Sequence, residues 1–190
     1  MIEVPGACCN FLRGRAFLGC AMELREYERA VVEHKDRVHS YAAWMLHDRE
    51  EARDVAQEAL VRLWTNRSTV RMDSVKSWLL RTVHNLSIDR MRRRKTRAEA
   101  DVEELNLLPD ESRPGPEQTA RGSEVGRVIG RALRKLSDRD RSLVLMREVH
   151  GLSYNEIAAN VDMPLGTLKA ALHRARERLR RELVGAGVRP

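Results

Sequence analysis

Apolar residues recur at three- and four-residue steps along most of this chain, which is the spacing of one face of an α-helix. The pattern runs from about Leu24 to Arg97, stops, and resumes from about Gln118 to Leu183. The sequence has no run of alternating β-branched residues bounded by turn signals, so a sheet is not supported. We therefore predict an all-α protein with two small helical domains.

The first helical segment divides into three predicted helices. Tyr27 to Leu46 carries one apolar stripe that would face a core. Asp48, followed three residues later by Glu51, is a capping-box signature, and it predicts a second helix over Ala52 to Trp64. The inward positions of that helix would be Val55, Ala59, Leu60 and Leu63, which leaves a polar face of Asp54, Gln57, Glu58 and Arg62. A third helix is predicted from Ser74 to about Arg94.

The stretch from Gly151 to Leu183 is typical of two helices joined by a tight turn. Ser153 and Glu156 form a second capping-box signature, and Pro164 suits the first position of the following helix. On that following helix the predicted inward stripe is Leu165, Leu168, Leu172, Ala175 and Leu179. The outward positions are then Thr167, Lys169, Ala170, His173 and Arg174.

This pattern predicts a helix-turn-helix that binds DNA. In such a motif the second helix lies in the major groove, with side chains near its N-terminus toward base edges and flanking cations toward phosphates. We therefore assign Lys169, His173 and Arg174 to the DNA side. The alternative is a solvated basic face on an ordinary helical hairpin. The capping box, the break between the two helices and the positive charge on one side of the second helix together favour DNA contact.

Between the two helical segments lies a sequence of a different kind. Acidic residues dominate from Glu99 to Glu117, and Pro109, Pro114, Gly115 and Pro116 interrupt any helix. We predict an extended linker over residues 98–117. The predicted domains are accordingly residues 22–97 and 118–185, with residues 1–21 as a poorly ordered N-terminal extension.

The charge of the chain favours a polyanionic partner. Lys and Arg number 35 against 28 Asp and Glu, for a formal net charge of +7. A dense group of cations ends the third predicted helix: Arg90, Arg92, Arg93, Arg94 and Lys95. Cations at a helix C-terminus interact favourably with the helix dipole. So many cations within about one and a half turns are better explained by a role in binding the phosphates of a nucleic acid. Trp78 on the same helix is interpreted mainly as a core residue.

Neither a metal nor a cofactor is expected. The three cysteines all lie in the first twenty residues, and the six histidines are scattered without ligand spacing. Reduced thiols in a cytoplasmic protein are the simplest account of the cysteines. No stretch of the sequence approaches the roughly twenty apolar residues of a membrane span, so no membrane insertion is expected.

Four segments together resemble one family, the bacterial sigma factors of the extracytoplasmic-function type in the primary-sigma superfamily. The segment from Asp54 to Trp64 is similar to the family's region-two helix that docks on RNA polymerase. The segment from Ser77 to Lys95 resembles the helix that reads and opens the minus-ten promoter element. The segment from Leu136 to Leu145, with the helix-turn-helix, resembles region four, which reads the minus-thirty-five element.

This resemblance implies partners and binding residues, and no catalytic residue. Core RNA polymerase, through its β′ clamp helices and β subunit, would contact Asp54, Gln57, Glu58 and Arg62. The minus-ten element would contact Trp78, Asn85, Asp89, Arg90, Arg92, Arg93 and Arg94. The minus-thirty-five element would contact Thr167, Lys169, Ala170, His173, Arg174 and Arg176. The family is commonly restrained by an anti-sigma factor, so such a partner is expected here as well.

The chain departs from the family pattern in two places. The family usually has glycine in the turn where this chain has Asp162, which tolerates the left-handed conformation better than most residues. The family also commonly has serine and arginine where this chain has Ala170 and Ala171. Loss of that arginine removes a phosphate or base contact, so DNA readout would depend more on Lys169, His173, Arg174 and DNA shape.

Two other functions are weighed against this reading. A conventional helix-turn-helix repressor or activator explains Gly151 to Leu183 but leaves the polar face of Asp54 to Trp64 and the basic cluster without a role. A recombinase or nuclease would need an N-terminal catalytic constellation, typically on an α/β scaffold, and the sequence has no strand pattern or clustered nucleophile and base.

Overall fold

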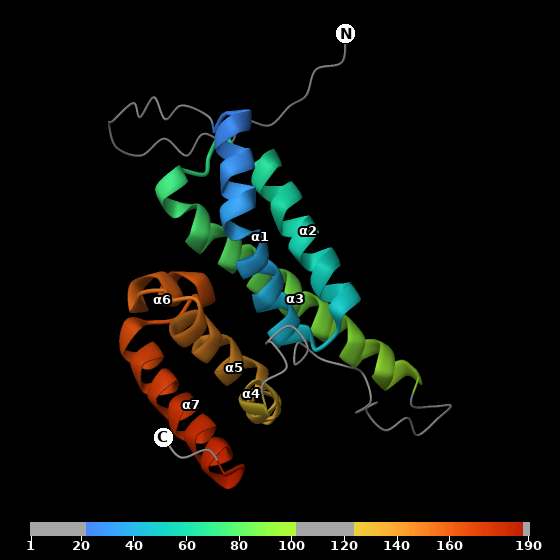
Figure 1. Ribbon diagram of the computed structural model, residues 1–190, viewed down its shortest axis with the longest axis vertical. Coiled ribbons are helices and arrows are strands. Elements are labelled where there is room, and N and C mark those ends of the chain that lie inside the picture. Colours follow the sequence, from blue (N-terminus) through green and yellow to red (C-terminus); the bar gives the residue numbers. More distant parts are fainter. Residues whose placement is uncertain (1–21, 102–123, 188–190) are drawn as a thin grey trace.

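The computed structural model describes residues 22–101 and 124–187, and all regular structure in these two ranges is helical (Figure 1). The prediction of an all-α protein is confirmed. The predicted N-terminal extension and residues 102–117 of the predicted linker lie outside the described residues. Among the described helices, none is long and apolar enough to cross a membrane.

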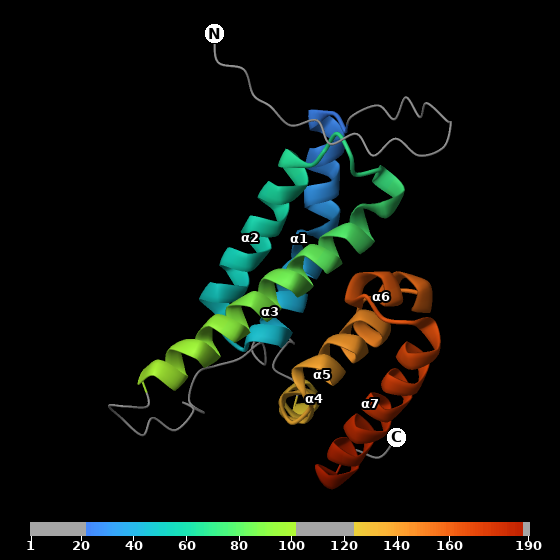
Figure 2. The same cartoon turned by 180° about the vertical axis from the view of Figure 1, so that it is seen from behind.

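The first unit consists of α1 (Leu24–Leu46), α2 (Arg49–Thr65), the short 3₁₀ helix η1 (Met72–Ser74) and α3 (Val75–Asp101). Figures 1 and 2 show α1 and α2 side by side, with α3 crossing them. The apolar stripes of the three helices face each other and bury side chains such as Tyr41, Met45, Leu63 and Leu79. The burial of these stripes provides the main drive for folding of the unit.

α1 begins where the helical periodicity begins, and α2 and α3 are longer than predicted. The backbone N–H of Glu23 donates to the Glu26 carboxylate and starts α1 at Leu24. Asp48 starts α2 at Arg49 by accepting the amides of Glu50 and Glu51, each within 3.0 Å. α3 continues to Asp101, four residues into the stretch predicted as linker.

The second unit begins with α4 (Glu124–Arg134) and α5 (Asp138–Val144), and α5 continues as one π-helical turn, η3 (Leu145–Val149). α6 (Tyr154–Val161) and α7 (Leu165–Gly185) complete it. Ser137 caps α5 by accepting the amide of Asp140 at 3.2 Å. The side chains of Leu143, Leu145, Leu152, Ile157, Leu168 and Leu172 form its buried interior.

The two units pack against each other within the described part of the chain. α5 lies against α1 and α6 lies against α3, as both views show (Figures 1 and 2). The buried side chains of the two units form one continuous apolar cluster. The sequence predicted two domains, and the structure adds a direct contact between them.

Candidate nucleic-acid interface

The helix-turn-helix of α6 and α7 has the geometry that its sequence predicts. The Ser153 hydroxyl accepts the Glu156 amide at 3.2 Å, and the Glu156 carboxylate accepts the Ser153 amide at 2.7 Å. These hydrogen bonds with Ser153 hold the pKa of Glu156 below its usual value. Asp162 ends α6 in the left-handed region, with φ of 50° and ψ of 57°. The turn therefore forms with aspartate in a conformation that glycine adopts most easily.

The face of α7 that was assigned to DNA is exposed. It comprises Thr167, Lys169, Ala170, His173, Arg174 and Arg176. The opposite face is held in the core by Leu168, Leu172 and Ala175. Within the described ranges Lys169 and Arg174 make no ion pair, so their charges are available to a partner. Arg176 instead pairs with Glu148 at 2.6 Å, and this hydrogen-bonded pair raises its pKa.

Three details at the start of α7 differ from the sequence prediction or refine it. Leu165 was predicted to face inward but is 38% exposed, because the first turn of a helix lies at the edge of the packed interface. Pro164 is the N-cap rather than the first helical residue. Ala171 is only 4% exposed, whereas Ala170 lies outside. Of the two alanines that stand where the family has serine and arginine, only Ala170 therefore lies on the outward surface.

α3 presents a second polar surface. Asn85, Asp89, Arg92 and Arg93 are exposed, and their spacing places them along one side of the helix. Arg81, also exposed, lies one turn before Asn85 and was missed by the sequence analysis, although the four-residue step could have revealed it. Trp78 and Arg90 are half-buried, and Trp78 packs against the core as predicted.

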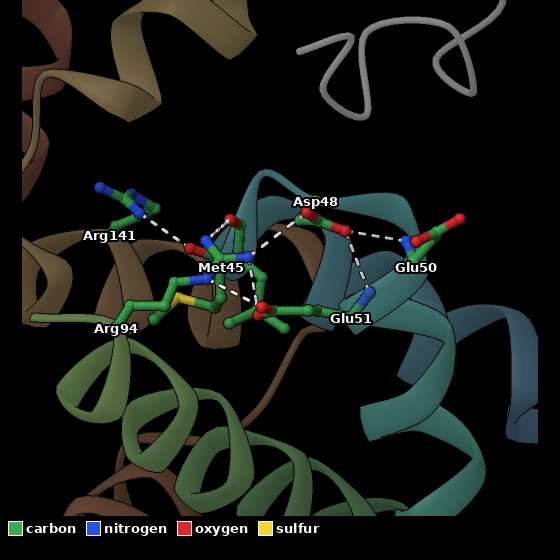
Figure 3. Close-up of polar contacts among 7 residues, drawn as sticks. Met45, Asp48, Glu50, Glu51, Arg94 and Arg141 are labelled. Atoms are coloured by element: carbon green, nitrogen blue, oxygen red, sulfur yellow. Dashed lines mark hydrogen bonds and ion pairs between the residues drawn. The ribbon is translucent and has the colours of Figure 1, made fainter. Parts of the chain in front are cut away.

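Arg94 differs from its arginine neighbours, because its half-buried guanidinium contacts several groups of the first unit (Figure 3). Nε donates to the Glu51 carboxylate at 2.9 Å, Nη1 donates to the Leu46 carbonyl at 3.1 Å, and Nη2 lies 3.5 Å from the Asp48 carboxylate. The Glu51 carboxylate, which would complete a capping box on α2, binds Arg94 instead. Arg94 thus ties α3 to the junction between α1 and α2.

α2 carries the third surface predicted from sequence. Asp54, Gln57 and Arg62 are exposed and Glu58 is half-buried, and Arg62 pairs with Glu58 at 2.6 Å one turn away. Val61, which is 54% exposed, lies on the same stripe as Asp54, Gln57 and Glu58. Val61 was not predicted as part of this surface, because only polar positions were assigned to it. The surface is therefore a polar stripe with one apolar side chain.

Comparison with known proteins matches both units to a single family. Residues 30–97 match the model of Sigma-70 region 2, and residues 126–179 match the model of Sigma-70, region 4. The chain is 34% identical over 155 residues to the ECF RNA polymerase sigma factor SigE of Mycolicibacterium smegmatis, covering 81% of this chain and 60% of that protein. It therefore spans less than two thirds of that relative.

A second relative is matched along most of its length. The chain is 32% identical to the ECF RNA polymerase sigma factor SigW of Bacillus subtilis over 158 residues, covering 79% of this chain and 84% of that protein. Among solved structures, the sigma factor RpoE in complex with the anti-sigma factor NepR from Bartonella quintana aligns with a TM-score of 0.69 at 22% identity. That alignment covers 84% of this chain and 98% of the solved chain, and it shows a shared fold.

Proposed function

This chain belongs to the family of ECF RNA polymerase sigma factors, and from that premise we propose that it binds core RNA polymerase and directs it to promoters. The observation that carries the proposal is the presence of region 2 and region 4 in order on one chain, each with an exposed polar face. A conventional repressor or activator would use the second unit only. It would leave the α2 surface and the α3 surface without a partner.

The α2 surface is the proposed contact with the polymerase. Asp54, Gln57, Glu58 and Arg62 would bind the β′ clamp helices, and Val61 adds an apolar contact in their midst. Such a surface fits a protein partner, because protein interfaces combine apolar contacts with polar groups. The Arg62–Glu58 pair would hold both side chains ready on the helix surface.

The exposed side of α3 is the proposed reader of the minus-ten element. Asn85 and Asp89 would lie near unpaired bases, while Arg90, Arg92 and Arg93 would bind phosphates. Half-buried Trp78 offers only its exposed part to DNA. We omit Arg94 from this group, because its guanidinium is already paired with Glu51 and bonded to the Leu46 carbonyl.

The outward face of α7 is the proposed reader of the minus-thirty-five element. Thr167 and Lys169 lie in its first turns and would approach base edges, while His173 and Arg174 would lie nearer the backbone. Arg176 would contribute less than Arg174, because it is paired with Glu148. An anti-sigma factor is a further proposed partner, in view of the solved complex of RpoE with NepR.

Transcription with purified core polymerase tests the proposal. The chain should bind core and produce a promoter-dependent run-off transcript that core alone does not make. The double variant Gln57→Ala with Glu58→Ala should lower binding to core at least tenfold and keep its helical circular dichroism. A matched control is Glu28→Ala with Glu33→Ala on exposed positions of α1, which should bind core like the parent chain. Failure of the parent chain to bind core RNA polymerase would refute the proposal.

A further inference from the structure

The two helical units meet along a seam, which we define by Tyr41, Met45, His47 and Ser77 of the first unit and Arg141, His150 and Asn160 of the second. Buried Arg141 donates from Nη1 to the Met45 carbonyl at 3.1 Å, across the seam (Figure 3). The Ser77 hydroxyl lies 3.5 Å from Oδ1 of Asn160. The rings of Tyr41 and His150 lie 5.4 Å apart between centroids. The seam is therefore a packed contact that contains polar and titratable groups.

Two histidines of the seam face cations in a reciprocal way. His47 belongs to the first unit, and Arg141 and Arg134 of the second unit act on it together with Arg94 of α3. His150 belongs to the second unit, and Arg37 and Lys76 of the first unit act on it. Burial is the larger cause in both cases, and it lowers the pKa of His47 to about 3 and that of His150 to about 4. Each unit thus presents a neutral imidazole to positive charges of the other.

Acidic groups near the seam are already engaged with arginines. Asp48 follows His47 in the chain, and its carboxylate lies 3.5 Å from Nη2 of Arg94. Asp138 lies 3.3 Å from Nη2 of Arg141. These carboxylates offset part of the positive charge of the arginines. A proton added to either histidine would still place a new charge in a buried region beside at least two cations.

We propose that the docked arrangement is a closed state that acid opens, with His47 and His150 as the proton-binding groups. Both imidazoles are neutral at pH 7.5 in the closed state and largely neutral in the open state. Below the ordinary histidine pKa of 6.5, both imidazoles bind protons in the open state. In the closed state the lowered pKa of about 4 for His150 and about 3 for His47 prevents proton binding until the pH is much lower. The docking is therefore fully favourable above pH 6.5 and weakens as the pH falls.

Two other buried histidines belong to the first unit alone. Nδ1 of His84 lies 3.0 Å from the hydroxyl of Tyr41, and His34 lies beside Glu33 on α1. Both partners are on α1, and Tyr41 is itself a seam residue, so variants of His47 and His150 are needed to identify the groups that drive the opening. His173 on α7 is exposed and serves as the control histidine.

The opening matters for promoter binding, and this step rests on the proposed function. The minus-ten and minus-thirty-five elements lie about 25 base pairs apart, which is roughly 85 Å of duplex at about 3.4 Å per pair. A compact chain of this size has a radius of gyration on the order of 15 Å. With α6 packed on α3, the two reading surfaces cannot reach both elements at once. The closed state must open before both can bind.

A thiol-accessibility measurement on the full chain tests the acid opening. Cys8, Cys9 and Cys20 are first replaced by serine, and a single cysteine is then placed on α6. Asn160→Cys reports on the seam, because Asn160 is only 7% exposed, and Asn155→Cys on the same helix is the exposed control. The ratio of their alkylation rates by iodoacetamide follows the opening equilibrium. Because both rates depend on thiol ionisation, this dependence on pH cancels in the ratio of the rates at positions 160 and 155.

We expect this ratio to rise about a hundredfold from pH 7.5 to pH 5.5, since two groups that titrate near 6.5 in the open state each contribute about tenfold. His47→Gln or His150→Gln should reduce the rise to about tenfold, and the double variant should remove it. His173→Gln should leave the hundredfold rise unchanged. Circular dichroism should show constant helicity throughout. A flat ratio in the parent chain, or a full rise in the double variant, overturns the proposal.

A distance measurement covers the case in which a cysteine at position 160 disturbs the fold. Single-molecule energy transfer between dyes at Val32 on α1 and Val184 on α7, both exposed, reports separation of the units directly. The closed population should dominate at pH 7.5. The open population should grow toward pH 5.5 in the parent chain, grow less in either single histidine variant, and stay constant in the double variant. An open chain at pH 7.5, or a closed population insensitive to pH, contradicts the inference. Neither measurement involves polymerase binding, so the acid opening and the proposed function are tested independently.

Discussion

Nη2 of Arg94 lies 2.7 Å from the Glu51 carboxylate, an ion pair that joins the basic end of α3 to the first turn of α2. Its neighbour Arg93 is exposed. Adjacent arginines of one basic cluster thus have different surroundings: Arg94 is half-buried in an ion pair, and Arg93 is exposed. Helical geometry points consecutive side chains about 100° apart, but the sequence does not reveal that Arg94 meets Glu51, which lies 43 residues away in the chain.

Arg94→Gln should therefore lower stability, whereas Arg93→Gln should weaken DNA binding. Loss of Arg94 removes the charge-assisted hydrogen bonds of its guanidinium. We expect the free energy of unfolding to fall by about 1 kcal/mol, a value that allows for the partial exposure of the pair. Arg93→Gln should leave stability unchanged and weaken binding to a minus-ten oligonucleotide, reducing the slope of log affinity against log salt by about 0.7. Urea denaturation and salt-dependent fluorescence anisotropy measure the two effects. Equal behaviour of the two variants would contradict the assignment.

Asp162 offers a test of the turn between α6 and α7. It holds a left-handed conformation, with φ of 50°, that costs an aspartate more than a glycine. Asp162→Gly should raise the free energy of unfolding of the second unit by about 0.5 kcal/mol, after allowance for the greater entropy of glycine in the unfolded chain. Asp162→Val should lower it by about 1 kcal/mol or more, because a β-branched residue tolerates positive φ poorly. Chemical denaturation measures both, and stabilisation by valine would refute the argument.

Arg174 and Arg178 form a matched pair on α7. Arg174 is exposed and makes no ion pair with a described residue, whereas Arg178 pairs with the buried Asp140 carboxylate. Arg174→Ala should weaken promoter binding and reduce the salt slope by about 1 without loss of stability. Arg178→Ala should leave Asp140 without its cation and lower the free energy of unfolding by about 1 kcal/mol. Reversed effects would show that the two arginines have been assigned to the wrong roles.

His84 makes the first unit sensitive to acid. Burial lowers its pKa to about 4, so the stability that depends on its neutral form is complete above pH 6.5 and is lost as the pH falls toward 4. In that window the free energy of unfolding of the parent chain should fall by an extra amount of about 1.4 kcal/mol per pH unit relative to His84→Gln. Denaturation at several pH values measures the slopes. Parallel slopes for the two chains would show that His84 is protonated equally in both states.

Several features were predictable because they depend on neighbours in the sequence. The Ser153–Glu156 capping box, the outward face of α7 and the buried stripe of Leu168, Leu172 and Ala175 all appear as predicted. Each depends on residues three or four positions apart, and helical geometry brings such residues together without help from the rest of the chain. The exposed Val61 could also have been found in this way, from its step of three and four residues after Glu58 and Gln57.

Other features could not be predicted from periodicity. The π-helical turn at Leu145–Val149 ends with the His150 amide bonded to the Leu145 carbonyl at 3.0 Å, and no local signal marks it. Leu165 fits the inward stripe by spacing but lies at the edge of the interface. The extension of α3 to Asp101 likewise overrides an acidic stretch that predicted a linker.

The helices, their caps and the faces that carry charge follow from short-range patterns in the sequence, because these features depend on side-chain type at short and regular spacing. Which cations remain free depends on tertiary packing, since Arg94 meets Glu51 and Arg141 meets the Met45 carbonyl across 43 and 96 residues of chain. Only the tertiary structure shows that the two units dock, with His47 and His150 facing cations of the opposite unit. Contacts between residues so far apart depend on how whole helices pack, and no local pattern encodes them.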